Sequence, residues 1–306
     1  MSKETVFLTF LFIILWNSGF ISAEYVLPYA QPFTILFWRY LVLTILVLTY
    51  IIVKKKIVWR GWKPMVYSML IGILAHGVWL GCVLFSLEND IPAGIIAMII
   101  SLQPLAIGAL SGLITGERAH TFQWFGLMLG FGGVIFTLGF RVNFSEYQSI
   151  IGYLLPIGAV ISMTIATLIQ RRLELHGGAL CLPVDICLFY QSLATLFVSF
   201  IPAFLIEDLS TQWNSNFILA MSWLVLAVSL GAYSLMWVLI KRLSAWRMAS
   251  LFYFGAPVTM FMAWFSFGDT SNLMDIMGLA MIFAGVALTY SPFHKNSPNS
   301  NEMNKF

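Results

Sequence analysis

Apolar residues form ten long stretches along this chain, and short polar segments separate them. The stretches cover approximately residues 5–24, 33–53, 65–87, 92–114, 121–140, 149–169, 184–205, 217–240, 247–267 and 273–290. A helix of roughly 20 apolar residues spans the hydrocarbon core of a bilayer. The strands of a membrane barrel are shorter and alternate in polarity. The pattern therefore predicts an all-α, polytopic membrane protein with ten transmembrane helices.

Composition supports a chain that is solvated mainly by lipid. Sixty per cent of the 306 residues are hydrophobic and 9% are charged, with a mean hydropathy of +0.89. Soluble domains carry roughly 25% charged residues. The few charges of this chain could not cover a globular surface in water. The net charge of +3, without a basic run interleaved with aromatics, argues against nucleic acid. The expected partners are membrane lipids and a small-molecule solute.

The distribution of basic residues predicts the orientation of the chain. Lys and Arg concentrate on the cytoplasmic side of membrane proteins. If the N-terminus is cytoplasmic and ten helices alternate, 14 of the 16 Lys and Arg residues lie on the cytoplasmic side. The two exceptions are Arg39, within the second helix, and Arg141, in an outside loop. A wrong helix count would scramble this separation. We therefore predict an inner-membrane protein with both termini cytoplasmic.

The two ends of the chain have alternative interpretations. Lys3 followed by an apolar stretch and Ser22-Ala23 could form a cleaved signal peptide. The length of this stretch and its interruption by Trp16-Asn17 favour a retained helix. Residues 291–306 are rich in Asn, Ser and Lys and are expected to form a disordered cytoplasmic tail.

An internal repeat divides the chain into two halves. Gly116-Glu117 and Gly268-Asp269 lie 152 residues apart, as do Gly126 and Gly278, and Gly133 and Gly285. Residues 1–140 and 149–290 would then each hold five helices. Because five is odd, the second half enters the membrane from the opposite side. Such inverted five-helix repeats are typical of secondary transporters, which bind substrate near the midplane between the halves.

Several motifs, taken in order, resemble the EamA-type carriers of the drug/metabolite transporter superfamily. In the first half they are Leu15–Phe20, Pro32, Trp38–Tyr40, Ser101–Pro104, Gly116–Arg118, Gln123–Gly126 and Gly130–Gly133; in the second half they are Ser229–Tyr233 and Pro257 to Asp269. The chain departs from the pattern at Asp269, where the family usually has glutamate, and at Ala256, which matches Pro104. The resemblance implies a ten-helix carrier that most commonly exports metabolites, amino acids or drugs. It does not identify the substrate.

Polar side chains inside the predicted helices are the first candidates for a transport site, because they are costly in lipid. Arg39 is expected to bind an anionic substrate group or to close an outer gate, and snorkelling to the headgroups is the alternative. His76 lies midway along the third helix, near Trp79. Histidine titrates near neutral pH and could pass a proton, or it is a hydrogen-bonded packing residue.

Further candidates are amide and aromatic side chains. Gln103 precedes Pro104, and prolines at 104, 156 and 257 are expected to break helices and free carbonyls beside a cavity. Aromatic side chains that could line a solute path, or else pack in the core, are Trp16, Trp79, Tyr233, Trp237 and Tyr253. With Asn17, Arg39, His76 and Gln103, these form the predicted substrate-binding set.

Two smaller features concern packing. Gly126, Gly130 and Gly133 lie on one helix face and favour close helix approach, either within the chain or between the subunits of a homodimer. Glu117 on the inner side is expected to pair with Arg118 or to cap the fifth helix.

Other functional classes have little support in the sequence. We find no G-x-S-x-G elbow, no H-E-x-x-H pair and no Walker loop, so no enzyme, ATP-driven transport, metal or cofactor is predicted. The three cysteines have no CxxC spacing. An importer of the same fold and, less favoured, a lipid flippase remain as alternatives.

Overall fold

The computed structural model describes residues 3–56, 59–89, 91, 96, 99–117, 120–139, 150–267 and 273–290. Within these ranges every named element is helical. In the first half the elements are α1 (Lys3–Val26), η1 (Leu27–Tyr29), α2 (Pro32–Val53), α3 (Trp62–Gly72), η2 (Ile73–Val78), α4 (Trp79–Glu88), α6 (Gln103–Ile114) and α7 (Thr121–Gly139). In the second half they are α8 (Ile150–His176), η3 (Gly178–Leu180), α9 (Val184–Leu205), α10 (Ser215–Trp223), η4 (Leu224–Ala232), α11 (Tyr233–Arg242), α12 (Ala245–Ser250), η5 (Leu251–Phe254), α13 (Gly255–Phe267) and α14 (Leu273–Tyr290).

The helices are long and apolar enough for a multi-pass membrane protein. In the described residues, seven helical stretches can cross a membrane by length and composition. Three shorter apolar helices, Gln103–Ile114, Thr121–Phe136 and Ile276–Thr289, accompany them. The all-α, polytopic prediction is therefore confirmed, whereas the count of ten crossings stays a prediction. The predicted tail from residue 291 onward lies outside the described residues.

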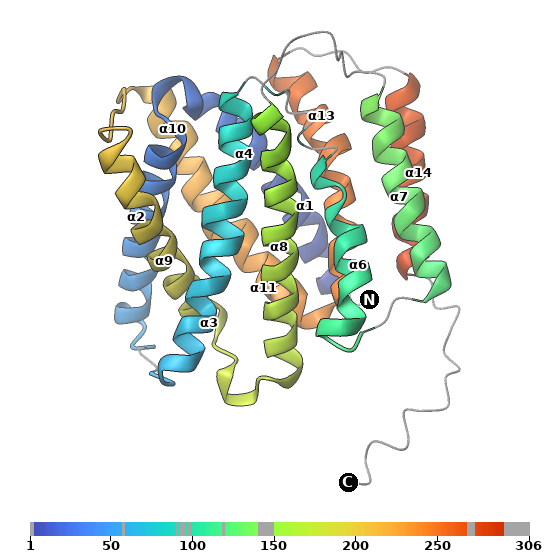
Figure 1. Ribbon diagram of the computed structural model, residues 1–306, viewed down its shortest axis with the longest axis horizontal. Helices are drawn as coiled ribbons and strands as arrows, with labels where there is room; N and C mark the ends of the chain where they lie inside the picture. Colours follow the sequence, from blue (N-terminus) through green and yellow to red (C-terminus); the bar gives the residue numbers. More distant parts are fainter. Residues whose placement is uncertain are drawn as a thin grey trace.

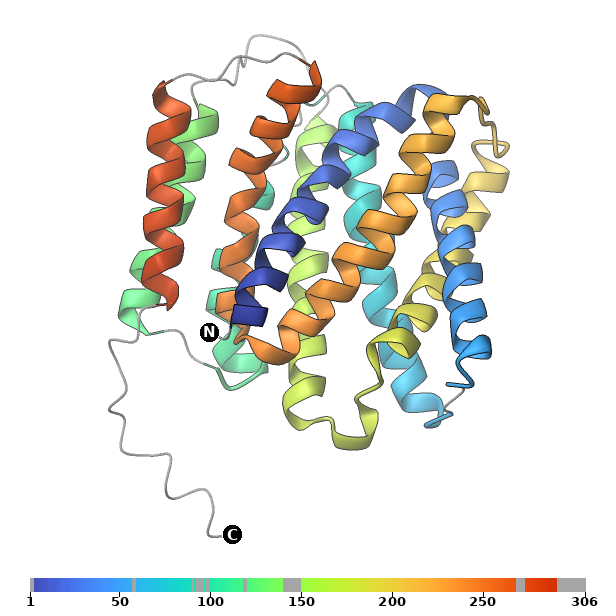
Figure 2. The same cartoon turned by 180° about the vertical axis from the view of Figure 1, so that it is seen from behind.

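The helices pack side by side in one bundle, with α2 and α9 at one edge and α7 and α14 at the other (Figure 1). Seen from behind, α1 runs through the middle of the bundle beside the continuous stretch of α10, η4 and α11 (Figure 2). The largest group of buried apolar side chains joins α1, α2, α4, η4 and α11. The centre of the protein is therefore built from both halves of the chain.

The contacts between helices keep the same pattern when the two halves are exchanged. α2 packs on α9, and α7 packs on α14; in each pair the 152-residue repeat relates one helix to the other. The first helix of each half packs on the other half, α1 on η4 and α8 on α4. Likewise α1 contacts α13, and α8 contacts α6. Each half thus completes its packing with the other half.

Two π-helical segments occupy corresponding places in the halves. η2 lies between α3 and α4 over Ile73–Val78, and η4 lies between α10 and α11 over Leu224–Ala232. Shifted by the 152-residue repeat, η2 falls entirely inside η4. A π turn leaves backbone groups out of the α-helical hydrogen-bond ladder, and such turns are common at functional sites. At the start of η2, the carbonyl oxygen of Gly72 accepts a hydrogen bond from Thr195 Oγ1 at 3.1 Å.

The prolines lie at interruptions of the helical stretches or inside a helix. Residues 99–100 are helical, 101–102 form a turn, and α6 then begins with Pro104 in its first turn. Pro257 lies in the first turn of α13, directly after the 3-10 segment η5 within the helical stretch Arg247–Ser266. A first-turn proline needs no intrahelical partner for its nitrogen, so both positions agree with the predicted breaks. Pro156 stands inside α8.

Carboxylates hold helix ends on both faces of the bundle. Glu207, which follows α9, accepts hydrogen bonds from the backbone nitrogens of Phe33 (3.0 Å) and Thr34 (2.6 Å) and from Thr34 Oγ1 (2.7 Å). It thereby caps α2 from a distant part of the chain. On the opposite face, Lys56 after α2 contacts Asp185 in the first turn of α9, with 2.9 Å between Nζ and Oδ2. The α2–α9 pair is tied at both ends.

Glycines bring α7 and α14 into backbone contact. A Cβ on Gly126 would lie 2.6 Å from the carbonyl oxygen of Gly285, and a Cβ on Gly133 would lie 2.8 Å from that of Gly278. The repeated glycines therefore meet each other crosswise. The glycine face of α7 is used within the chain, which is one of the two arrangements that the sequence left open.

We expect Gly126→Ala to destabilise the protein, because the added methyl group would overlap the Gly285 backbone. Overpacking of this kind costs about 1–3 kcal/mol. Thermal unfolding in detergent micelles measures the effect. Gly132→Ala is the matched control, since a Cβ there meets Met281 at an ordinary 3.6 Å. Equal melting temperatures for the two variants would show that α7 and α14 are not packed this closely.

Candidate functional site

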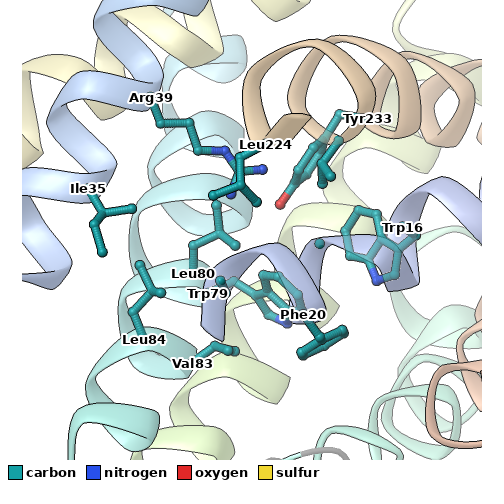
Figure 3. Close-up of a pocket in the computed structure, with 13 residues that line it drawn as sticks. Trp16, Phe20, Ile35, Arg39, Trp79, Leu80, Val83, Leu84, Leu224 and Tyr233 are labelled. Carbon is teal, nitrogen blue, oxygen red and sulfur yellow. The ribbon is translucent and has the colours of Figure 1, made fainter. Parts of the chain in front are cut away.

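A cavity lies at the centre of the bundle where α1, α2, α4, η4 and α11, from both halves, meet (Figure 3). It is lined by Trp16, Gly19, Phe20, Ala23, Ile35, Arg39, Trp79, Leu80, Val83, Leu84, Leu224, Val228 and Tyr233. The space between its atoms, which includes a part open to solvent, is about 480 Å³. A water molecule's centre can reach only about 30 Å³ of this space. In this conformation the cavity is therefore narrow.

Aromatic rings form one wall of the cavity. The ring of Trp16 on α1 lies 5.3 Å from that of Trp79 on α4 and 4.9 Å from that of Tyr233 on α11, measured between centroids. All three side chains are buried. The structure thus brings together three of the predicted aromatic residues, and the opposite wall is aliphatic (Figure 3).

Arg39 is the charged residue of the cavity lining. Its side chain comes from α2, is 3% exposed and points toward Tyr233 and Leu224 (Figure 3). Nε donates a hydrogen bond to Ser229 Oγ at 2.6 Å, and the guanidinium lies 5.8 Å from the centroid of the Tyr40 ring. Nη2 is buried without a hydrogen-bond partner. Arg39 therefore does not snorkel to the headgroups.

A polar cluster lies behind the aromatic wall. Gln191 Oε1 on α9 accepts a hydrogen bond from Trp237 Nε1 at 2.9 Å and lies 3.1 Å from His76 Nε2. This arrangement suits a His76 tautomer that carries its proton on Nε2. The His76 ring lies 4.0 Å from the Tyr233 ring, whose hydroxyl donates to the carbonyl oxygen of Ala75 at 3.1 Å. His76 and Trp237 thus support the cavity wall from behind.

The other predicted site residues lie away from the cavity lining. Asn17 faces Gly255 at the start of α13, and its Nδ2 donates to the carbonyl oxygen of Ile13 at 2.7 Å. Tyr253 packs its ring on Gly130 and donates to the carbonyl oxygen of Leu127 at 2.7 Å. Gln103 is fully buried on α6, and its side-chain Nε2 and Oε1 have no hydrogen-bond partner. For these three, a role in binding stays a prediction.

Two polar residues of the network were absent from the predicted set. Gln191 stands 152 residues after Arg39, so the repeat itself could have identified it. Ser229 similarly stands 152 residues after Gly77, and Gly77 directly follows His76 in the sequence. In each half, a polar residue of the second segment bonds to the π segment of the other half: Arg39 to Ser229, and Gln191 to His76.

On the face that carries the end of α8, Glu117 connects three segments. Arg171 donates to the Glu117 carboxylate, with 3.0 Å between Nε and Oε2, and its Nη1 donates to the carbonyl oxygen of Ile240 at 2.7 Å. The same carboxylate accepts from the backbone nitrogen of Ala245 at 3.0 Å. The first-turn nitrogens of a helix need an acceptor, and Glu117 supplies one to α12, not to the predicted fifth helix. Arg118, the predicted partner, lies outside the described residues.

Comparison with known proteins finds a family match over the first half of the chain. Residues 3–139 match the EamA-like transporter family. A probable amino-acid metabolite efflux pump of Salmonella typhimurium is 20% identical over 300 residues, covering 96% of this chain and 97% of that protein. The uncharacterized inner membrane transporter YedA of Escherichia coli is 24% identical over 285 residues, covering 91% of this chain and 88% of that protein. The uncharacterized transporter YvbV of Bacillus subtilis is 25% identical and covers 76% of each chain.

A solved structure shares the fold. A chain described only as "Crystal structure of protein" matches with a TM-score of 0.77 at 18% identity, covering 95% of this chain and 98% of that chain. At this identity the likeness shows the fold alone.

We expect Gln191→Leu to destabilise the protein, because it removes the acceptor for Trp237 Nε1 and His76 Nε2. Leaving buried donors unsatisfied costs about 1–3 kcal/mol. Thermal unfolding in detergent measures the loss, and Gln212→Leu, at an exposed position, is the control. A Gln191→Leu protein as stable as the control would show that the cluster contributes nothing to the packed state.

Proposed function

We propose that the chain is an EamA-type transporter of the drug/metabolite transporter superfamily, and that it exports small organic solutes by alternating access, without ATP. The family and the named relatives are transporters and not enzymes. The observation that carries the proposal is the central cavity, which α1, α2, α4, η4 and α11 enclose jointly. A site between two halves can be opened to either side when the halves rock against each other.

The exchange of contacts between the halves supports ten crossings in two inverted repeats. The crosswise glycine pairs of α7 and α14, and the matching π segments η2 and η4, follow the same 152-residue offset. In this proposal the three shorter apolar helices cross the membrane with the seven longer ones. The two π segments, where the backbone ladder is already interrupted, are the natural places for a segment to bend.

Export in a bacterial inner membrane is supported by the relatives. One is named an amino-acid metabolite efflux pump and another an inner membrane transporter. The end of α2, the start of α3 and the ends of α8 and α11 lie on the same face of the bundle (Figure 1). These ends carry Lys54, Arg172 and Arg242, and the positive-inside bias supports assigning this face to the cytoplasm.

We expect Trp79→Ala to reduce solute flux in proteoliposomes at least about tenfold, because it opens one side of the aromatic wall. Trp62→Ala, at an exposed ring near the membrane surface, is the control. Both proteins are compared after equal incorporation into the lipid. Unchanged flux for Trp79→Ala would place the solute path elsewhere. In expressing cells, resistance to toxic amino-acid analogues or dyes indicates export, and greater sensitivity would assign import.

We expect tags on the two chain ends to be protected together in sealed right-side-out vesicles. An even number of crossings places both ends on the same face, and the positive-inside bias favours the cytoplasmic one. Protease digestion of the tags, with and without detergent, measures their location. Tags digested at one end only would require an odd number of crossings and would end the proposal of two five-helix repeats.

A further inference from the structure

The buried charges of the described residues are not all compensated in the same way. Arg171 is paired with the Glu117 carboxylate, and the Glu207 carboxylate accepts from Phe33 and Thr34. Arg39 has one neutral acceptor, the Ser229 hydroxyl, and the face of the Tyr40 ring. A buried charge is costly unless it is paired and hydrogen-bonded. Of these three buried ions in the described residues, Arg39 is therefore the one with neither an opposite charge nor a helix N-terminus beside it, and the one with a buried nitrogen left without a partner.

The position of Arg39 directs this unpaired charge into the cavity. The cavity lining contains Arg39 but no Asp or Glu. Nη2 is buried and has no hydrogen-bond partner, while Nε is occupied by Ser229. Its guanidinium points toward the space between Leu224 and Tyr233 (Figure 3). A guanidinium in an apolar site is a strong receptor for a carboxylate, because both the charge and the N–H donors are directed at it.

The rest of the lining determines what the anionic group is attached to. Trp16, Trp79 and Tyr233 offer flat ring surfaces, and Leu80, Val83 and Leu84 are aliphatic. Such walls favour an apolar, ring-containing body. A second negative charge would have no cation in the lining, and an ammonium group would have no carboxylate there. The charge of one carboxylate matches the single positive charge of the site.

We propose that the cavity binds organic monocarboxylates with an aromatic or similarly apolar body and an uncharged far end, and that Arg39 holds the carboxylate. This substrate class rests on the proposed transport function. It narrows that function to acids whose amino group is absent or blocked. It also assigns Ser229 a positioning role, since its hydroxyl orients the guanidinium through Nε.

Binding of probe compounds to the purified full-length protein in detergent tests the class directly. The probes are 3-phenylpropionate, its neutral isostere 3-phenylpropionamide, phenylalanine and phenyl phosphate. Quenching of tryptophan fluorescence reports binding, because Trp16 and Trp79 line the cavity. We expect 3-phenylpropionate to bind at least about tenfold more tightly than each of the others. Equal binding of the carboxylate and its amide would overturn the proposal, as would tighter binding of phenylalanine or phenyl phosphate.

Substitutions at Arg39 assign the effect to this residue. We expect Arg39→Gln to abolish the preference for the carboxylate over the amide, and Arg39→Lys to retain part of it. Arg172→Gln, which removes an exposed arginine, is the control and should keep the full preference. If Arg39→Gln is not monodisperse, the wild-type comparison of the two isosteres and the Arg39→Lys protein still decide the question. A full carboxylate preference in folded Arg39→Gln would contradict the role of Arg39.

Flux measurements separate this inference from the transport proposal. Tight binding of 3-phenylpropionate without flux of any solute would leave the site assignment standing and remove the transport function. Flux of other solutes without preferential binding of the carboxylate would do the reverse.

Discussion

The structure depends on one constraint: a polar group removed from water must find a partner inside the protein. Helical hydrogen bonds satisfy most backbone polar groups. The remaining groups are satisfied by partners that are particular to this protein. Where η2 begins, the Gly72 carbonyl oxygen takes a hydrogen bond from Thr195 on another helix. Where α2 begins, its free nitrogens are satisfied by Glu207. In the central cavity the rule is left incomplete at Arg39, as it also is at Gln103 on α6.

The same constraint explains why the two halves cannot be packed independently. Arg39 of the first half reaches the π segment of the second, and Gln191 of the second half reaches that of the first. Glycine at position 72 permits this approach, since a Cβ there would overlap the backbone of Gln191. The polar contacts therefore cross between the halves at the depth where the ladder is interrupted. A movement of α2 or α9 in one half would therefore strain its hydrogen bond to the π segment of the other half.

The sequence predicted the elements well, because a run of 20 apolar residues has few structural alternatives in lipid. It also singled out Arg39, since a lone charge in such a run is unusual. It could not place Asn17, Gln103 or Tyr253, because helices that are apolar all round do not show which face points inward. The partner of Glu207 lies 173 residues away at Thr34, beyond any local pattern. The π segments were equally hidden, as their residues would suit an α-helix.

The fastening of α2 to α9 is unequal at its two ends. At one end, Glu207 is 5% exposed and makes three hydrogen bonds to α2. At the other end, the Lys56–Asp185 ion pair has side chains 48% and 19% exposed, and an exposed pair contributes at most about 1 kcal/mol. A hollow lined by Val47, Lys56, Asp185 and Leu188 already lies beside the weaker fastening. We therefore expect α2 and α9 to separate more readily at the Lys56 end than at the Glu207 end.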